Sequence, residues 1–236
     1  MADKSYKIYT LGCKVNQYDA AVLAGSLEKA GLSPARKNAD IAVVNTCAVT
    51  RTAIQKGKRM INKARTENPG AWLVILGCWP QVYPDEAKIV GADILLGAGA
   101  PWEAADKIVQ ICGLSARVLS DNSVRLVKTS RTRYFIKIQD GCEQYCSYCI
   151  IPYARGKLRS RPAAEVVREV QAAAAAGYRE VVLSGIHLGL YGCDRHKPYG
   201  LVSLLDELHA INGLKRIRLS SIEATEVTPE LVALIG

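Results

Sequence analysis

Three cysteines within one eight-residue segment constrain this chain more than any other feature. They are Cys142, Cys146 and Cys149, spaced Cys-x3-Cys-x2-Cys, and a strand-like run at residues 134–138 leads into them. A loop that leaves a strand can turn three sulfurs toward one small object, whereas a strand points alternate side chains to opposite faces. Three thiolates suit a soft metal centre, and the fourth nearby ligand of a closed zinc site is missing. The spacing therefore favours a cubane iron–sulfur cluster with one iron left open.

The composition indicates a globular chain with metal or redox chemistry. Its 236 residues can form one large or two small domains, and 49% of them are apolar. Neither a signal sequence nor an apolar run of membrane-spanning length is present, so we expect a cytoplasmic protein with no membrane partner. Eight cysteines in such a protein indicate metal or redox chemistry rather than disulfides. The net charge of +9 is compatible with a polyanionic partner.

Strands and helices alternate in the first half of the chain. Strand-like runs cover residues 7–11, 41–44, 72–76 and 93–96, and helical segments separate them. This alternation predicts an α/β domain with a doubly wound parallel sheet, in which ligands bind beyond the carboxyl ends of the strands. Cys13, Cys47 and Cys78 each follow one of three successive strands. We interpret them as a second three-thiolate cluster site, and three unrelated buried thiols are the alternative.

The second half of the chain predicts three units in which a strand is followed by a helix. Residues 115–133 lack an apolar period, so we place one domain at residues 1–128 and a second at 129–236. Strands are expected at residues 134–138, 180–184 and 215–221, with helices at 162–177, 201–212 and from Thr228 onward. Three units cannot close a barrel. We therefore expect an incomplete barrel whose third strand leaves an exposed sheet edge.

The cysteine motif and its flanks resemble a known family. The spacing at residues 142–149, with Tyr148 before the last cysteine, resembles the cluster motif of radical S-adenosylmethionine (SAM) enzymes. Residues 137–142 and 150–162, together with 10–18 and 44–50, resemble the radical SAM methylthiotransferases. Residues 14–17 (KVNQ) are nearer the bacterial branch that modifies N6-threonylcarbamoyladenosine at position 37 of tRNA. The resemblance runs from about Tyr6 to the end of the chain.

The resemblance implies a fold, a reaction and its cofactors. The implied fold is the N-terminal methylthiotransferase domain followed by the first part of a radical SAM partial (β/α) barrel, with the remainder beyond Gly236. The implied cofactors are two 4Fe–4S clusters and SAM. The cluster of the 142–149 motif would cleave SAM, and an auxiliary cluster on Cys13, Cys47 and Cys78 would deliver sulfur, giving a 2-methylthio-adenosine. The implied partners are the tRNA anticodon loop and an electron donor such as flavodoxin or ferredoxin, and no catalytic residue beyond the cluster ligands is required.

Further candidate residues follow from the same resemblance. Residues 184–187 occupy the place of a glycine-rich turn that receives the methionine end of SAM, where glycine permits close backbone approach. For His187 a purely structural loop histidine is the alternative. The cofactor-binding candidates are Tyr148, Arg155, Ser184, Gly185, His187, Ser220, Ser221 and Glu223.

A cationic segment predicts contacts with nucleic acid. Residues 51–65 carry no acid, and cations spaced three or four apart share one face of a helix. Such a face can bind tRNA phosphates, and a solvated helix face is the alternative interpretation. The candidates for RNA contact are Arg51, Lys56, Arg59, Lys63, Arg159 and Arg161.

Three other functions stay open at this point. The same chemistry could act on isopentenyl-adenosine in tRNA or on an aspartate of a ribosomal protein. A third possibility is a non-enzymatic metal-cluster module that only binds RNA. Cys193, in a polar loop, is interpreted as a free thiol, and neither it nor Cys112 is assigned a role.

Overall fold

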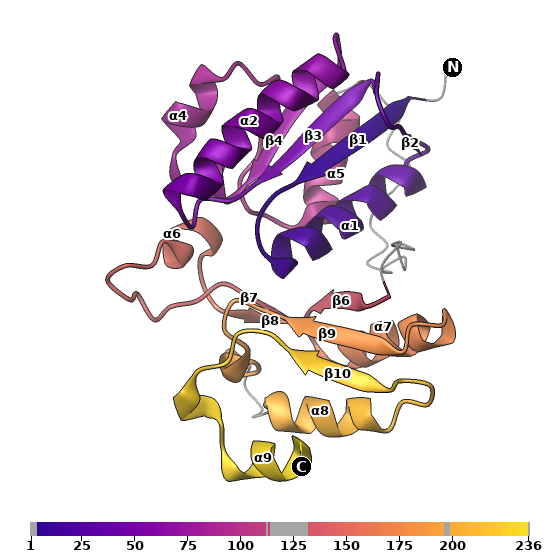
Figure 1. Ribbon diagram of the computed structural model, residues 1–236, viewed down its shortest axis with the longest axis vertical. Coiled ribbons are helices and arrows are strands. Elements are labelled where there is room, and N and C mark those ends of the chain that lie inside the picture. Colours follow the sequence, from indigo (N-terminus) through magenta and orange to yellow (C-terminus); the bar gives the residue numbers. More distant parts are fainter. Residues whose placement is uncertain (1–3, 112, 114–131, 196–198, 236) are drawn as a thin grey trace. The chain divides into compact units, whose positions relative to one another are not determined.

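The computed structural model describes residues 4–111, 113, 132–195 and 199–235. Its chain forms two compact units, which are described separately (Figure 1). The first unit comprises Met1–Val127 and Cys146–Arg155, and the second comprises Lys128–Tyr145 and Gly156–Gly236. The boundary expected between residues 128 and 129 lies outside the described residues, as does Cys112.

The first unit is built on a five-stranded parallel sheet. Its strand order is β2-β1-β3-β4-β5, and every pairing is parallel. The strands are β1 (Ser5–Thr10), β2 (Ser33–Pro34), β3 (Ile41–Thr46), β4 (Trp72–Gly77) and β5 (Ile94–Leu95). The central strand β3 is buried along its whole length, as its unbroken apolar run Ile-Ala-Val-Val predicts for a sheet covered on both faces.

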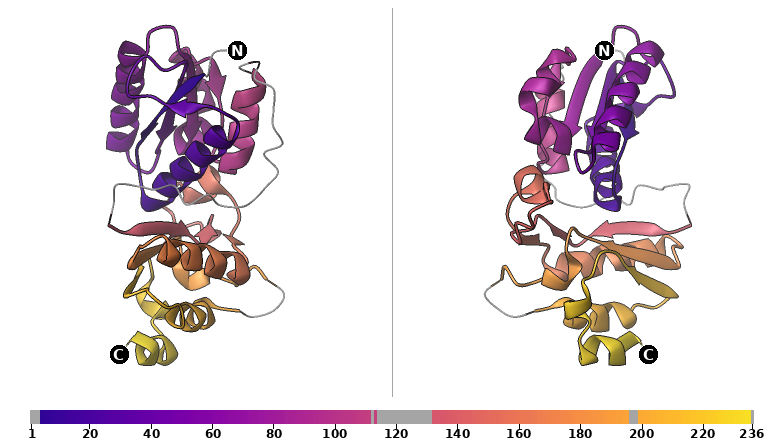
Figure 2. Two further views of the ribbon diagram at one scale, coloured as in Figure 1. Left: turned by 90° about the vertical axis from the view of Figure 1, so that its right-hand side faces the viewer. Right: turned by 60° about the vertical axis from the view of Figure 1, so that its left-hand side comes forward.

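Helices cover both faces of this sheet, as Figure 2 shows. Leu23 and Leu27 of α1 pack with Ile108 of α5 on one face, and Ile61 of α2 packs with Trp79 of α3 on the other. The helices are α1 (Lys14–Lys29), α2 (Arg51–Glu67), α3 (Cys78–Val82), α4 (Pro84–Ile89) and α5 (Pro101–Ile111). The predicted doubly wound α/β fold is therefore confirmed.

An ion pair joins the sheet to the end of α2. Glu67 accepts hydrogen bonds from Lys7 Nζ at 2.6 Å and from Tyr9 Oη at 2.5 Å, both on β1. These two donors hold the pKa of the Glu67 carboxyl at about 2, below its usual range. The folded pKa is depressed, so the stabilisation is complete above the pKa of the unfolded chain, about 4.3, and is lost as the pH falls toward 2.

We expect Glu67→Gln to destabilise the protein at neutral pH and to lose this effect in acid. Urea unfolding of both proteins between pH 7 and pH 2 measures it. The difference in unfolding free energy between wild type and variant should shrink as the pH falls from about 4 to about 2. A difference that stays constant over this range would show that the charge of Glu67 contributes nothing.

The second unit holds a three-stranded parallel sheet in the order β10-β9-β6. Each strand precedes a helix, so the three predicted strand–helix units are present. The elements are β6 (Tyr134–Lys137), α7 (Ala163–Ala175), β9 (Glu180–Ser184), α8 (Leu201–His209), β10 (Arg216–Leu219) and α9 (Pro229–Ile235). Thr228 caps α9, since its Oγ1 accepts from the backbone N–H of Leu231 at 3.3 Å. At the sheet edge, Arg216 and Arg218 of β10 are exposed and pair with Glu180 of β9.

Several of the shortest elements were not predicted from the sequence. In the second unit, β7 (Gln139–Asp140) pairs antiparallel with β8 (Arg159–Ser160), and two 3-10 turns, η1 (Leu188–Leu190) and η2 (Ala224–Glu226), follow β9 and β10. In the first unit, α6 (Ile151–Arg155) is a five-residue helix. Segments of this length show no period from which a helix or strand can be predicted. Among the described residues no helix has both the length and the apolarity that a membrane crossing requires.

Candidate metal centres

The ends of three neighbouring strands in the first unit each carry a free cysteine. Cys13 caps the start of α1 just after β1, Cys47 directly follows β3, and Cys78 is the first residue of α3 after β4. Cys47 and Cys78 are buried, whereas Cys13 is exposed. Since β1, β3 and β4 are adjacent and parallel, the three cysteines lie at the same edge of the sheet.

Buried side chains fasten these three strand ends together. Asn16 is 1% exposed, and its Nδ2 donates to the carbonyls of Leu11 at 2.8 Å and Thr46 at 3.0 Å. Thr46 Oγ1 donates to the carbonyl of Leu76 at 2.8 Å. Each accepting carbonyl lies one or two residues before one of the cysteines. The loops that carry Cys13, Cys47 and Cys78 are therefore linked by hydrogen bonds between side chain and backbone.

A close backbone approach adds to this arrangement. Gly77 has a φ of 102°, and a Cβ at this position would lie 2.5 Å from the carbonyl oxygen of Thr46. Only glycine adopts this conformation and leaves this space at low cost. The absence of a side chain at Gly77 thus lets the end of β4 pack directly against the end of β3, next to Cys47.

The electrostatics of Cys78 reflect its neighbours. Burial raises the pKa of the Cys78 thiol, the Arg155 guanidinium opposes this rise, and the thiols of Cys47 and Cys13 add to it. The three cysteines thus follow adjacent parallel strands at one edge of the sheet, and their convergence on a cluster stays a prediction.

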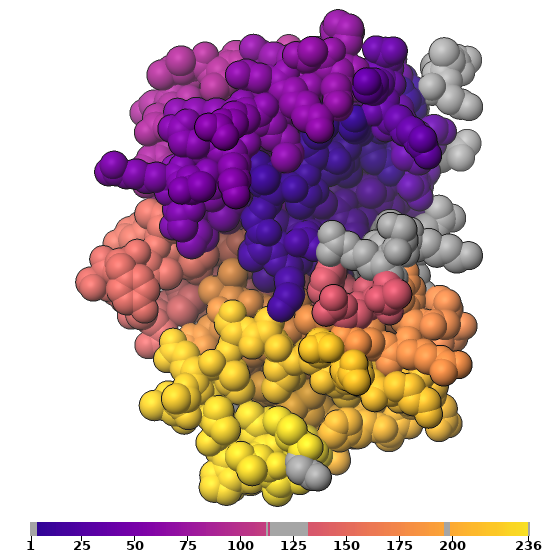
Figure 3. All heavy atoms as spheres, viewed as in Figure 1, coloured from indigo at the N-terminus to yellow at the C-terminus, as the bar shows by residue number. Residues whose placement is uncertain are grey.

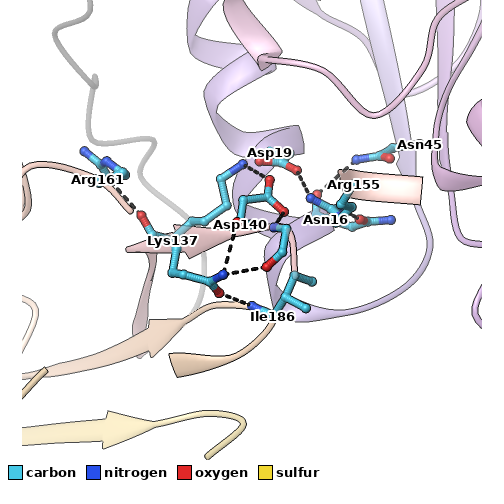
Figure 4. A network of polar contacts seen from close by, with 10 residues as sticks. Asn16, Asp19, Asn45, Lys137, Asp140, Arg155, Arg161 and Ile186 are labelled. Carbon is cyan, nitrogen blue, oxygen red and sulfur yellow. Dashed lines mark hydrogen bonds and ion pairs between the residues drawn. The ribbon is translucent and has the colours of Figure 1, made fainter. Parts of the chain in front are cut away.

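Arg155 lies in the first unit, although it follows the second cysteine triad in sequence. It ends α6, whose Ala154 packs in the same apolar cluster as Cys78 and Trp79. The Arg155 side chain is 4% exposed, with Nη1 at 3.3 Å from Asp19 Oδ2 and Nη2 donating to Asn16 Oδ1. Figure 4 shows Arg155 directed toward Asn16 and Asp19. The sequence led us to expect SAM binding here, whereas the contacts in the structure are with α1.

The three cysteines of the second triad belong to different units. Cys142 belongs to the second unit and is buried, and its backbone N–H donates to the carbonyl of Gly156 at 3.1 Å. Cys146 and Cys149 belong to the first unit and are half-buried, in a turn closed by a 2.9 Å hydrogen bond from Cys149 N to Cys146 O. Tyr148, within this turn, is 90% exposed.

Gln139 ties the approach to Cys142 to the turn after β9. Its Oε1 accepts from the backbone N–H groups of Ile186 at 2.8 Å and His187 at 2.9 Å, and its Nε2 donates to the carbonyl of Gly141 at 2.6 Å. Gln139 is fully buried. The sequence analysis missed this residue because a glutamine near a strand end is most simply interpreted as solvent-facing.

The predicted SAM-binding turn lies beside Cys142. Within the second unit, His187 Nδ1 lies 3.9 Å from Cys142 Sγ, and its Nε2 contacts the Glu226 carboxylate. Glu223 Oε1 is 3.9 Å from the same Nε2, and Gly185 N donates to Ser220 Oγ at 3.3 Å. Ser184 is buried, whereas Ser221 is exposed. The structure thus places His187 beside Cys142, links Glu223 to His187 and Ser220 to Gly185, and adds Glu226, which the sequence analysis did not single out.

The cationic candidates differ in their surroundings. The helix α2 occupies an outer face of the first unit in Figure 3. Its four candidates are exposed, namely Arg51, Lys56, Arg59 and Lys63. Arg159 is exposed on β8. Arg161 is engaged within the second unit, where it pairs with Glu169 at 2.8 Å and donates to the carbonyl of Lys137 at 2.9 Å. Glu169 also accepts from Tyr134 Oη, so Arg161 belongs to a structural network.

The two cysteine triads offer the soft sulfur ligands that iron–sulfur clusters take. Within the part of the chain that the structure describes, no three His, Cys, Asp or Glu side chains are arranged around one metal ion. A four-iron cluster holds its thiolates farther apart than one ion does. Two sets of three free cysteines, which are soft ligands, suit such clusters.

Comparison with protein families defines the class. Residues 5–97 match the family described as "Uncharacterized protein family UPF0004", and residues 136–235 match the radical SAM superfamily. The chain thus contains a radical SAM domain, and a domain that matches a second family precedes it.

Curated relatives define the family within that class. The chain is 40% identical over 242 residues to threonylcarbamoyladenosine tRNA methylthiotransferase MtaB of Bacillus subtilis, covering 96% of this chain and 53% of the relative. It is 38% identical to the protein of that name from Thermotoga maritima, with coverages of 97% and 54%, and 33% identical to ribosomal protein uS12 methylthiotransferase RimO of Desulfitobacterium hafniense, with coverages of 99% and 56%. The chain belongs to the radical SAM methylthiotransferase family. It spans about half the length of these relatives.

Solved structures share the fold. The radical SAM methyltransferase TsrM of Kitasatospora setae matches with a TM-score of 0.63 at 19% identity, over 98% of this chain and 57% of that chain. The cobalamin-dependent SAM radical enzyme OxsB matches with a TM-score of 0.59 at 9% identity, over 92% and 38%. At such identities the likeness shows a common fold.

Proposed function

We propose that this chain is part of a tRNA methylthiotransferase that inserts a methylthio group at C2 of N6-threonylcarbamoyladenosine at position 37. The observation that carries the proposal is the pair of free cysteine triads in a chain of this family. The preference for this nucleoside rests on the relatives, since five proteins named MtaB match at 31–40% identity. The proteins named for dimethylallyladenosine match at 30%.

The proposal assigns different tasks to the two triads. Cys142, Cys146 and Cys149 hold a 4Fe–4S cluster with an open iron, and Cys13, Cys47 and Cys78 hold an auxiliary 4Fe–4S cluster. When bound, the first cluster supplies the electron that cleaves SAM and the second supplies sulfur. An external carrier such as flavodoxin or ferredoxin provides that electron.

The surrounding residues position the cofactor. Gln139 fixes the turn at Gly185 and His187 against the backbone that precedes Cys142. This turn presents the backbone of Gly185, with Ser220 Oγ hydrogen-bonded to it, as a surface for the methionine end of SAM. Ser184, Ser221, Glu223 and Tyr148 remain candidates for contacts with SAM.

The substrate test uses three substrates side by side. The protein that carries this chain is reconstituted with iron and sulfide without oxygen, reduced, and supplied with SAM. The substrates are tRNA with N6-threonylcarbamoyladenosine, tRNA with isopentenyl-adenosine, and ribosomal protein uS12. Mass spectrometry should detect the methylthio product only with the first. Product with either other substrate would change the assigned substrate, and the absence of both SAM cleavage and product would favour a module that only binds RNA.

Cluster content tests the two-triad assignment. Iron and acid-labile sulfide should be about eight each per chain, with Mössbauer spectra typical of 4Fe–4S centres. About four irons would leave one cluster, and the proposal would reduce to a radical SAM enzyme without an auxiliary cluster.

The exposed cations of α2 should contribute to tRNA affinity. The change is Lys56→Gln, Arg59→Gln and Lys63→Gln together, because cations on one helix face release counterions from phosphates on binding. We expect weaker binding at 50 mM salt and a salt dependence of log K that is less steep by about 0.7–0.9 per lost phosphate contact. Filter binding across a salt series measures both quantities.

The matched control for α2 removes the same charge elsewhere. Lys37, Lys88 and Lys107 are exposed in the first unit and lie outside α2. Changing all three to Gln should leave tRNA binding nearly as in the wild type. Equal weakening by both triple variants would mean that only net charge matters and that α2 makes no specific contact.

A further inference from the structure

Arg155 is a buried cation held by two side chains of α1. Its side chain is 4% exposed, and it forms an ion pair with Asp19, whose side chain is 12% exposed, at 3.3 Å. Its second nitrogen donates to the neutral amide oxygen of Asn16. Removing a charge from water is costly unless partners compensate for it. These contacts attach the end of the five-residue helix α6 to α1.

The contacts of Arg155 lead directly to the first cysteine triad. Asn16, which accepts from Arg155, uses its own amide to hold the carbonyls of Leu11 and Thr46, just before Cys13 and Cys47. Ala154 packs in the apolar cluster that contains Cys78. Arg155 is thus connected to the loops of Cys13 and Cys47 through Asn16. Its neighbour Ala154 packs in the apolar cluster that contains Cys78.

The charge of Arg155 also acts on the triad. A guanidinium stays protonated at any pH at which the protein is folded. Three thiolates that bind a cluster place negative charge at a largely buried site, where a fixed cation nearby is favourable because the local dielectric constant is low. The helix α6, which ends at Arg155, contacts α3, which begins at Cys78.

We propose that Arg155 is a positioning residue of the auxiliary cluster, which holds the Cys13 and Cys47 loops through Asn16 and places a permanent positive charge beside Cys78. The inference rests on the proposed function, in which these three cysteines bind an iron–sulfur cluster. It also replaces the SAM-binding role that the sequence suggested for Arg155. The segment that follows the second triad would then set the redox properties of the cluster on the first.

The test isolates the auxiliary cluster. In a background variant, Cys142, Cys146 and Cys149 are all changed to Ala, so that the spectra report only the cluster on the other three cysteines. Arg155→Met, Arg155→Lys and Asp19→Asn are added singly, with Arg168→Met as the control. Arg168 is exposed on α7 and belongs to the second unit, so its replacement removes the same charge outside the unit that holds Cys13, Cys47 and Cys78. Redox titration monitored by electron paramagnetic resonance measures the midpoint potential.

The expected shifts differ in sign among the variants. Loss of a positive charge disfavours the reduced cluster, so Arg155→Met should lower its reduction equilibrium constant about tenfold, equivalent to about 59 mV for one electron. Arg155→Lys should recover most of the potential because it keeps the charge. Asp19→Asn should shift the potential upward, since it leaves the Arg155 charge less compensated, and Arg168→Met should leave it unchanged.

The outcomes separate this inference from the proposed function. If the background variant binds no iron, the auxiliary-cluster assignment itself fails. If it binds about four irons, but Arg155→Met has the potential of Arg168→Met, the inference on Arg155 is overturned. If Arg155→Met does not fold, the other two variants decide the question. The inference on Arg155 is overturned if Asp19→Asn does not raise the midpoint potential, or if Arg155→Lys and Asp19→Asn shift the potential in the same direction.

Discussion

Replacing Cys146 with Ala should abolish SAM cleavage, whereas replacing Cys47 with Ala should spare cleavage and abolish formation of the methylthio product. Cys146→Ala removes a ligand of the second triad, and Cys47→Ala removes a ligand of the first. Each variant should therefore lose the four irons, about half of the total, that its own triad binds and keep the cluster of the other triad. Release of 5′-deoxyadenosine from SAM measures the first activity, and nucleoside mass spectrometry measures the second. This separation is the largest effect that we expect from single substitutions.

Cys193→Ala is the matched control for both variants. Cys193 is an exposed free cysteine outside the two triads. Its replacement should leave the iron content and both activities at wild-type levels. If Cys47→Ala and Cys146→Ala lost both activities equally, the division of roles between the triads would be wrong.

Gly141→Ala should disrupt the second triad. Gly141 has a φ of 72°, and a Cβ there would lie 1.9 Å from the backbone carbonyl oxygen of Lys157. The two backbone segments must separate, which breaks the 3.1 Å hydrogen bond between Cys142 N and Gly156 O. We expect a cost of about 4 kcal/mol or more in unfolding free energy and loss of the SAM-cleaving cluster.

Gly177→Ala separates backbone strain from steric overlap. Gly177 has a φ of 93°, but nothing lies within 4 Å of the position that its Cβ would occupy. This variant should lose only about 1–2 kcal/mol, the usual cost of a left-handed residue with a side chain, and keep both clusters. Urea unfolding and iron analysis of the two variants give the comparison. Similar losses in both would mean that the contact with Lys157 is relieved at little cost.

The strands that position the first triad could be predicted because their signal is local. An unbroken apolar run such as Ile41–Val44 indicates a buried parallel strand, and parallel strands must end at the same sheet edge. Cysteines directly after three such strands could therefore be expected to converge without any knowledge of side-chain contacts. The strand–helix units of the second half were predictable for the same reason.

The surroundings of Arg155 and Gln139 could not be predicted in this way. Arg155 was assigned by its closeness in sequence to the second triad, but its contacts, Asn16 and Asp19, are more than 130 residues away. No period in residues 150–156 indicates which side chains a five-residue helix will meet. Gln139 is polar yet fully buried, and its role depends on backbone groups of the 185–187 turn that only folding brings near.

The placement of α6 in the first unit has a consequence for how the protein is made. Residues up to Val127 leave this unit without α6, and the missing piece emerges only after the chain has passed through Lys128–Tyr145. Ala154 would be absent from the apolar cluster around Trp79 until then. Synthesis proceeds at about 5–20 residues per second, so α6 is made a few seconds after α5. The first unit cannot complete its apolar core before then. Cutting the chain between residues 127 and 128 would thus yield a first unit that lacks part of its core.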